Sequence, residues 1–154
     1  MAKTMGDQQA HDQLAAYFCQ LAEAFGLPRS VALIYHVLYL AEGPVAVAEI
    51  ISRSGLSKGS VSTGIRLLER MKFVHLVVIP TDRRSFYEPE LSLSRLAAGL
   101  IEESFGPTLE KGAATLEEIS ALDHLSPHYR ARLASLRHWN ETVRGLLPAL
   151  SLLD

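Results

Sequence analysis

The sequence lacks the features that would place it in a membrane or outside the cytoplasm. Its 154 residues include a single cysteine, Cys19, so no disulfide can form within the chain. The longest apolar run, residues 31–41, is interrupted by His36 and is far shorter than the roughly 20 residues that a membrane span needs. No apolar signal segment follows the polar start at residues 1–13. We therefore expect a cytoplasmic protein with no transmembrane helix.

An excess of charge is also missing, and the sum conceals an asymmetry. The chain carries 15 Lys and Arg residues against 17 Asp and Glu residues, a net charge of −2, which taken alone disfavours a nucleic-acid partner. Residues 44–86, however, hold seven basic and three acidic side chains, a net charge of +4, and the remainder of the chain carries −6. The chain is thus a basic segment inside an acidic frame.

Internal repeats, low-complexity tracts and Pro/Gly/Ser-rich linkers are absent as well, so the composition predicts one continuous unit over residues 1–154. Apolar residues at helical spacing predict that this unit is mainly α-helical. Pro107 is expected to kink or split the helix that contains it. The expected helices cover residues 7–25, 28–42, 45–54, 57–71, 93–122 and 127–153.

The middle of the chain follows the order of a winged helix-turn-helix. The turn Gly55-Leu56-Ser57 separates two helices; its glycine permits a positive φ, and Ser57 occupies the N-cap position of the second helix. The apolar pattern then becomes strand-like at residues 73–79 and 85–89, which predicts a β-hairpin with a charged tip. Together these elements predict a winged helix over residues 28–90, made of a three-helix unit and a hairpin wing and flanked by N- and C-terminal helices.

The second helix of this motif has a small, polar and basic outer face. The major groove of DNA admits an α-helix, and small residues allow its close approach. Lysine and arginine donate to guanine or phosphate, hydroxyls contact bases or phosphate, and the free amides at the helix start favour a phosphate. A solvated surface helix is the alternative interpretation. The candidate DNA contacts are Ser57, Lys58, Gly59, Ser60, Ser62, Thr63, Arg66 and Arg70.

The charged tip of the hairpin adds a second basic element. Arg83 and Arg84 lie where a wing would project toward a neighbouring minor groove, whose narrow A·T segments attract arginine. Asp82 is expected to pair with one of these arginines and to hold its side chain extended. A charged turn that keeps the hairpin soluble is the alternative. Because two basic elements in this order are far more specific than either alone, they predict double-stranded DNA as the partner.

Segments of this region resemble the MarR-type winged helix-turn-helix regulators of bacteria. Ser57-Lys58-Gly59-Ser60-Val61-Ser62 resembles the start of their recognition helix, Leu67-Leu68-Glu69 with Phe73-Val74 its end, and Asp82-Arg83-Arg84-Ser85 their wing. The first of these segments, combined with Phe86-Tyr87-Glu88-Pro89, is most similar to the GbsR-like branch, whose members are linked to choline or glycine-betaine sensing.

The resemblance implies a transcription regulator, in particular a repressor that binds a pseudo-palindromic operator as a homodimer. Residues 7–25 and 91–153 would then be dimerisation helices, and Arg84 would be the wing arginine that enters the minor groove. The chain departs from the family pattern at Gly59, Gly64 and Leu91-Ser92.

MarR-type proteins commonly bind an effector between the dimer helices and the winged unit. Aromatic side chains expected in that region could bind a quaternary ammonium ion through cation–π attraction, or an aromatic compound. The alternative is that they pack in the core, as aromatic residues on buried helices usually do. The candidate pocket residues are Tyr17, Tyr35, His36, Tyr39 and Trp139.

No enzyme class finds support in the sequence. Residues 55–60 lack the spacing and ending of a phosphate loop, and no nucleophile with a neighbouring base stands out. His124 and His128 lack a third metal ligand, and Cys19 has no cation nearby in sequence that would activate its thiol. We expect no catalytic residue, metal or cofactor. The competing function is a winged-helix protein-interaction module whose basic face contacts an acidic partner.

Overall fold

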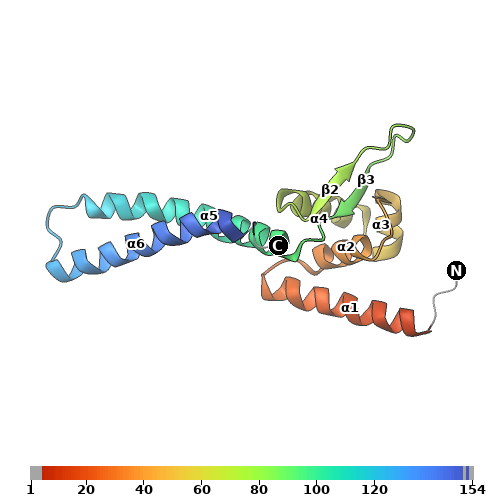
Figure 1. Ribbon diagram of the computed structural model, residues 1–154, viewed down its shortest axis with the longest axis horizontal. Coiled ribbons are helices and arrows are strands. Elements are labelled where there is room, and N and C mark those ends of the chain that lie inside the picture. Colours follow the sequence, from red (N-terminus) through yellow and green to blue (C-terminus); the bar gives the residue numbers. More distant parts are fainter. Residues whose placement is uncertain (1–4, 151, 153–154) are drawn as a thin grey trace. The chain divides into compact units, whose positions relative to one another are not determined.

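The computed structural model describes residues 5–150 and 152, without the side chain of Leu93. The described residues contain six helices and three short strands (Figure 1), and the predicted mainly helical, winged helix-turn-helix class is confirmed. The chain divides into two compact units, one up to Leu91 and the other from Ser92. Within the described residues, no helix is long and apolar enough to cross a membrane.

The first unit is built around α2, whose side chains are buried on almost every side. Ile34 and Leu38 have no exposed surface, and Val31 and Val37 are nearly as buried, because α1 packs on one side of this helix while α3, α4 and β3 contact others. The elements of this unit are α1 (Met5–Ala24), α2 (Arg29–Tyr39), β1 (Val45–Ala46), α3 (Val47–Ser54), α4 (Lys58–Arg70), β2 (Val74–Val77) and β3 (Phe86–Pro89).

A three-stranded antiparallel sheet with the strand order β1-β3-β2 supports the wing. The prediction of helix for Val45 and Ala46 is wrong, since these two residues form β1 and pair with Tyr87 and Phe86 of β3. Both are buried, and pairing with a distant strand satisfies their backbone groups. A short apolar run fits either a strand or a helix, so the distant strand decides between them.

The second helix is shorter than predicted. α2 ends at Tyr39, with Leu40 as its C-cap at φ −90° and ψ −1°, so the expected end at Glu42 is wrong. Gly43 precedes Pro44, and steric contact with the proline ring disfavours helical backbone at that position. The chain instead turns into β1.

The second unit is a helical hairpin of α5 (Leu93–Ser120) and α6 (Pro127–Leu150). Of the predicted kink or split at Pro107, the split is wrong: α5 continues through this residue, and packing against α6 offsets the hydrogen bond that proline removes. Pro127 opens α6 as predicted, with the Ser126 hydroxyl accepting from the Tyr129 amide at 3.3 Å. The expected end of this helix, residue 153, lies outside the described residues.

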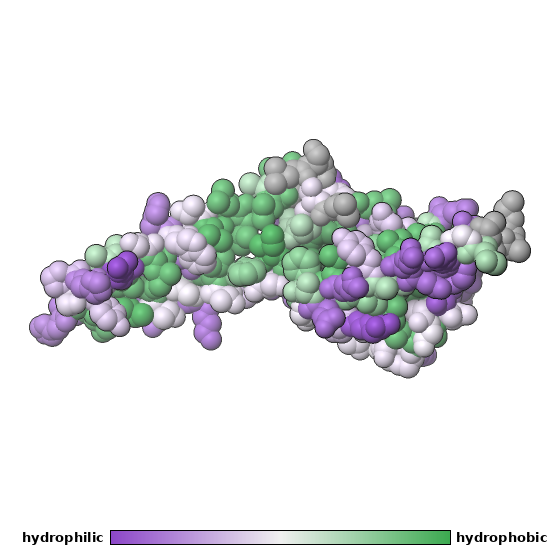
Figure 2. Space-filling model, turned by 90° about the horizontal axis from the view of Figure 1, so that it is seen from below, coloured by the Kyte–Doolittle hydropathy of each residue, from purple (hydrophilic) through white to green (hydrophobic). Residues whose placement is uncertain are grey.

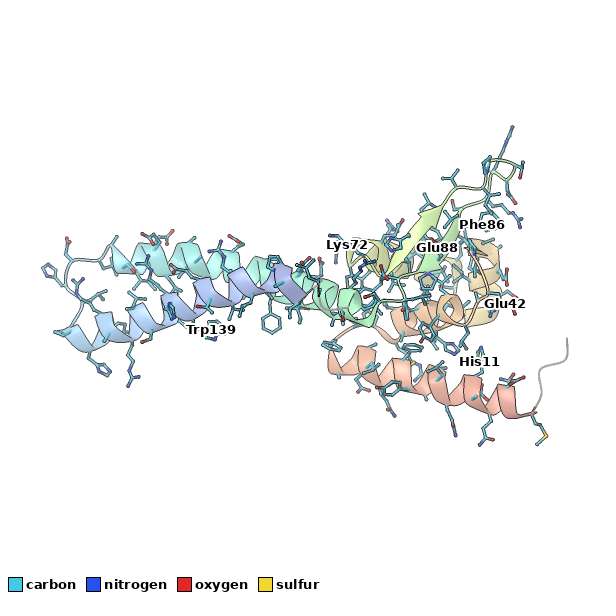
Figure 3. The ribbon with its side chains drawn as sticks, in the orientation of Figure 1. His11, Glu42, Lys72, Phe86, Glu88 and Trp139 are labelled. Atoms are coloured by element: carbon cyan, nitrogen blue, oxygen red, sulfur yellow. The ribbon has the colours of Figure 1, made fainter. Side chains whose placement is uncertain are left out.

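Two neighbouring residues of α6, Asn140 and Trp139, lie in opposite environments. Asn140 is 5% exposed and donates through Nδ2 to the carbonyl of Leu109 on α5 at 3.2 Å. Trp139 is 53% exposed, and Figure 3 shows it on the second unit.

Candidate nucleic-acid interface

The turn between α3 and α4 has the geometry that its residues predict. Gly55 adopts φ +69° at the C-cap of α3, where its missing Cβ removes the steric penalty. The Ser57 hydroxyl accepts a hydrogen bond from the Ser60 amide at 3.1 Å and donates to the Ser60 hydroxyl at 3.0 Å. The cap fixes the position at which α4 begins.

The two faces of α4 divide as the sequence predicts. Val61, Ile65 and Leu68 are buried, and Gly64 lies so close to α2 that a Cβ added there would overlap Cδ1 of Ile34. The opposite side of α4 and its first turn are exposed. All eight candidate contacts lie in this exposed part: Ser57, Lys58, Gly59, Ser60, Ser62, Thr63, Arg66 and Arg70.

A shallow hollow of about 290 Å³ separates the start of α2 from α4. Gly59, Ser60 and Thr63 line it from α4, and Ser30 lines it from α2. The hydroxyl groups can donate to or accept from base edges or phosphates. Arg66, on the same helix, is folded along α4, with Nε donating to the Ser62 carbonyl at 3.3 Å.

The wing carries the most strongly organised polar group of this unit. Asp82 accepts from the Arg84 side chain at 3.0 Å through Nε and at 2.6 Å through Nη2, and from the Arg84 backbone amide at 2.9 Å. The predicted pairing of Asp82 with one arginine is therefore present, and Arg84 is the arginine. Its side chain remains 65% exposed while Asp82 is 25% exposed, so the guanidinium is fixed and still accessible.

The contact between Asp82 and Arg84 shifts the pKa of both groups. The side-chain hydrogen bond from Arg84, with its backbone amide and positive charge, lowers the pKa of the Asp82 carboxyl to about 2. The same hydrogen bond and the negative charge of Asp82 raise the pKa of Arg84, and the charge of Glu49 on α3 adds to this effect. The pair is therefore fully ionised at neutral pH.

Arg83 differs from its neighbour. Its side chain is exposed, and within the described residues neither a hydrogen bond nor an ion pair holds it. The structure thus separates two arginines that the sequence treats alike.

Sequence reasoning missed one residue at this site, Phe86. The guanidinium carbon of Arg84 lies 5.1 Å from the centre of the Phe86 ring. The spacing of two residues was the available signal, because side chains two apart in extended chain share a face.

The candidate pocket residues lie in different environments. Tyr35 and His36 are buried in an aromatic cluster in which the ring of Phe18 lies 5.4 Å from Tyr35 and 5.3 Å from Tyr39. The Tyr35 hydroxyl donates to the Glu90 carbonyl at 2.6 Å, and burial raises the pKa of this phenol. Tyr39 and Tyr17 are 36% and 55% exposed, and Trp139 belongs to the second unit.

A metal site and a reactive cysteine are the two other kinds of site that the sequence raised. The described residues hold no group of three or more His, Cys, Asp or Glu side chains placed to bind a metal ion. Cys19 is a free, partly buried thiol beside Glu23 and Arg29 in a hollow between α1 and α2.

Comparison with known proteins relates this geometry to one family. Residues 25–85, which include α2, the helix-turn-helix and the tip of the wing, match the model of the MarR family. No curated protein matches the chain.

One solved structure shows the same fold over most of the chain, and others are more distantly similar. A transcriptional regulator superposes with a TM-score of 0.65 at 18% identity, covering 93% of this chain and 94% of that chain. A mutant of MepR from S. aureus bound to an oligodeoxyribonucleotide has a TM-score of 0.46 at 17% identity, covering 88% of this chain and 94% of that chain. BpsR of Bordetella bronchiseptica, whose DNA binding is regulated by 6-hydroxynicotinic acid, has a TM-score of 0.37 at 16% identity. The match covers 87% of this chain and 95% of that chain.

Proposed function

We propose that this chain is a DNA-binding transcription regulator of the MarR type. One observation carries the proposal: the exposed face of α4 and the fixed arginine of the wing belong to the same compact unit. Both also lie within the segment that matches the family model. The basic segment of an otherwise acidic chain thus coincides with the two elements that a winged helix uses to read DNA.

In this mechanism α4 enters the major groove and the wing reaches the adjacent minor groove. Lys58 and Arg70 bind phosphates or guanine, whereas Ser60 and Thr63 are close enough to the hollow to contact base edges. Arg84 offers its guanidinium to the minor groove, where the negative potential of narrow A·T segments attracts it.

We propose further that two copies bind a pseudo-palindromic operator and repress transcription in the bacterial cytoplasm. Two-fold symmetry would place the half-sites about one helical turn, ~34 Å, apart. Exposed apolar side chains support self-association: Tyr17 on α1 and Phe25, which directly follows this helix, are 55% and 52% exposed. Figure 2 shows further apolar surface along the α5–α6 hairpin, where Phe105, Tyr129, Leu136, Trp139 and Leu146 are at least half exposed.

An effector completes the proposal. Following the resemblance to the GbsR-like branch, we propose a quaternary ammonium ligand, with an aromatic compound as the other class, at Tyr17, Tyr35, His36 and Tyr39 of the first unit. Calorimetry with choline and glycine betaine tests this ligand. No heat at millimolar concentration would assign Tyr35 and His36 to core packing alone, as their burial favours.

Selection of bound sequences from a random duplex library tests the central proposal. The expected result is enrichment of a palindrome with a fixed spacing between its halves. Affinity for the selected duplex should fall linearly with the logarithm of salt concentration, with a slope set by the number of phosphate contacts.

The opposite result would identify the competing function. If no sequence is enriched and every duplex binds at the same weak level, the basic face does not read DNA. The chain would then be a winged-helix module that recognises an acidic protein partner.

A further inference from the structure

The Arg84 guanidinium has only part of its hydrogen-bonding capacity in use. Asp82 occupies the side of the guanidinium formed by Nε and Nη2, and within the described residues no hydrogen bond engages Nη1. The donors of Nη1 are therefore left for another partner, and the Arg84 side chain is 65% exposed. An end-on donor of this kind fits a narrow groove, whereas the side-on, bidentate contact is already taken by the aspartate.

Hydrogen bonds to Asp82 hold one edge of the guanidinium. A second contact would restrict the motion that remains to the group. The Phe86 ring supplies this contact, with its centre 5.1 Å from the guanidinium carbon, within the range of a cation–π interaction. Figure 3 shows Phe86 on the strand that leads away from the wing tip.

The backbone of Phe86 is held on both sides. Phe86 belongs to β3, the central strand of the sheet, and pairs with Ala46 of β1 on one side and Val77 of β2 on the other. Only 8% of the residue is exposed. The buried ring therefore offers the guanidinium a fixed surface in addition to the carboxylate of Asp82.

We propose that Phe86 is a positioning residue for DNA recognition, whose ring holds the Arg84 guanidinium in the plane in which Nη1 faces the DNA. This inference rests on the proposed function, because it names how the wing arginine of that function is prepared for binding. Preorganisation of this kind lowers the side-chain entropy that binding would otherwise cost.

A double-mutant cycle on the selected duplex tests the coupling between ring and arginine. Arg84→Ala should weaken binding about ten-fold or more, and Phe86→Leu about two- to five-fold, as expected for an exposed cation–π contact. In the Arg84→Ala background, Phe86→Leu should have no further effect. Phe86→Tyr, which keeps the ring, should bind like the unmodified chain.

Phe73→Leu is the matched control, because Phe73 is also 8% exposed. Its ring packs against the ring of Tyr35, with 6.0 Å between the ring centres, and not against an arginine. Phe73→Leu should lower the melting temperature as Phe86→Leu does and leave DNA affinity unchanged. Arg83→Ala is the control for Arg84→Ala, because it also removes one positive charge from the wing tip but leaves the arginine that Phe86 contacts.

NMR of the unmodified chain tests the contact without any substitution. The ring current of Phe86 should shift the Arg84 side-chain protons away from their usual positions, and an unshifted signal would overturn the inference. Equal effects of Phe86→Leu in both backgrounds would also overturn it while the chain still binds its duplex. Failure of the unmodified chain to select any duplex would instead reject the proposed function.

Discussion

Adjacent arginines at the wing tip, Arg83 and Arg84, have the same charge and opposite degrees of order. Arg84 is held by Asp82 and Phe86, whereas Arg83 extends into solvent. Ordering a long side chain on binding costs free energy. That cost is already met for Arg84 in the free protein, so Arg84 is suited to a specific contact and Arg83 to a general electrostatic one.

The ionisation of Asp82 measures this local order. Its pKa should be about 2 in the folded chain, below the ordinary value of 3.8, and should return close to the ordinary value in Arg84→Ala. Because the folded-state pKa is lowered, the pair contributes fully to stability above the ordinary pKa and loses its contribution as the pH falls toward 2. Carboxyl chemical shifts followed by NMR during an acid titration measure this value. An unchanged pKa in Arg84→Ala would contradict the pairing.

Among the elements, α4 combines two opposite uses of glycine. Gly59 lies on the exposed side of the helix, where a Cβ would meet nothing within 4 Å, and so the backbone there can approach a ligand. Gly64 lies against α2, where a Cβ would overlap Ile34. Each glycine costs up to about 1 kcal/mol of helix stability relative to alanine. In the proposed function the first cost permits contact with DNA, and the second permits close helix packing.

Alanine substitution distinguishes the two positions. Gly59→Ala should raise the free energy of unfolding by up to about 1 kcal/mol, since helix propensity improves without a clash. Gly64→Ala should lower it by about 1 kcal/mol, since forcing a methyl group against the fully buried Ile34 costs about 1–3 kcal/mol and exceeds the propensity gain. Urea unfolding of the two variants gives both values. Equal stabilisation would show that Ile34 moves aside freely.

At the scale of the whole molecule, charge is segregated along the sequence. The segment with a net charge of +4 contains α4 and the wing, and the rest carries −6. In the proposed function, only the basic face approaches a phosphate backbone without repulsion, so the acidic remainder would restrict the orientation of bound DNA. Large exposed apolar side chains lie along α1 and its C-terminal end, on the α5–α6 hairpin and on the wing, and the proposed dimer would bury those of the first two regions.

Light scattering after size exclusion tests the proposed dimer. The chain should have about twice the mass of its 16.9 kDa protomer, and the variant with Tyr17→Asp and Phe25→Asp should have the mass of one protomer, because charge disfavours burial of the interface. Leu76→Asp with Val78→Asp is the matched control on the wing, where both residues are also more than half exposed. A monomeric unmodified chain would reject the homodimer.

The sequence by itself determined the elements whose signals are local. The N-cap at Ser57, the glycine turn at Gly55 and the apolar stripe of α4 depend on neighbours within a few residues, so periodicity and capping chemistry predicted them. The pairing of Asp82 with Arg84 is equally local, because the two residues are separated by one position.

Tertiary structure decided what depends on distant partners. Val45 and Ala46 form a strand because β3, some 40 residues later, pairs with them, and α5 passes through Pro107 while packing against α6. The Phe86 ring contacts the Arg84 guanidinium from β3, a strand that pairs with both β1 and β2. Local propensities differ by only about 1 kcal/mol per residue. Long-range pairing and burial therefore determine the final conformation wherever the two disagree.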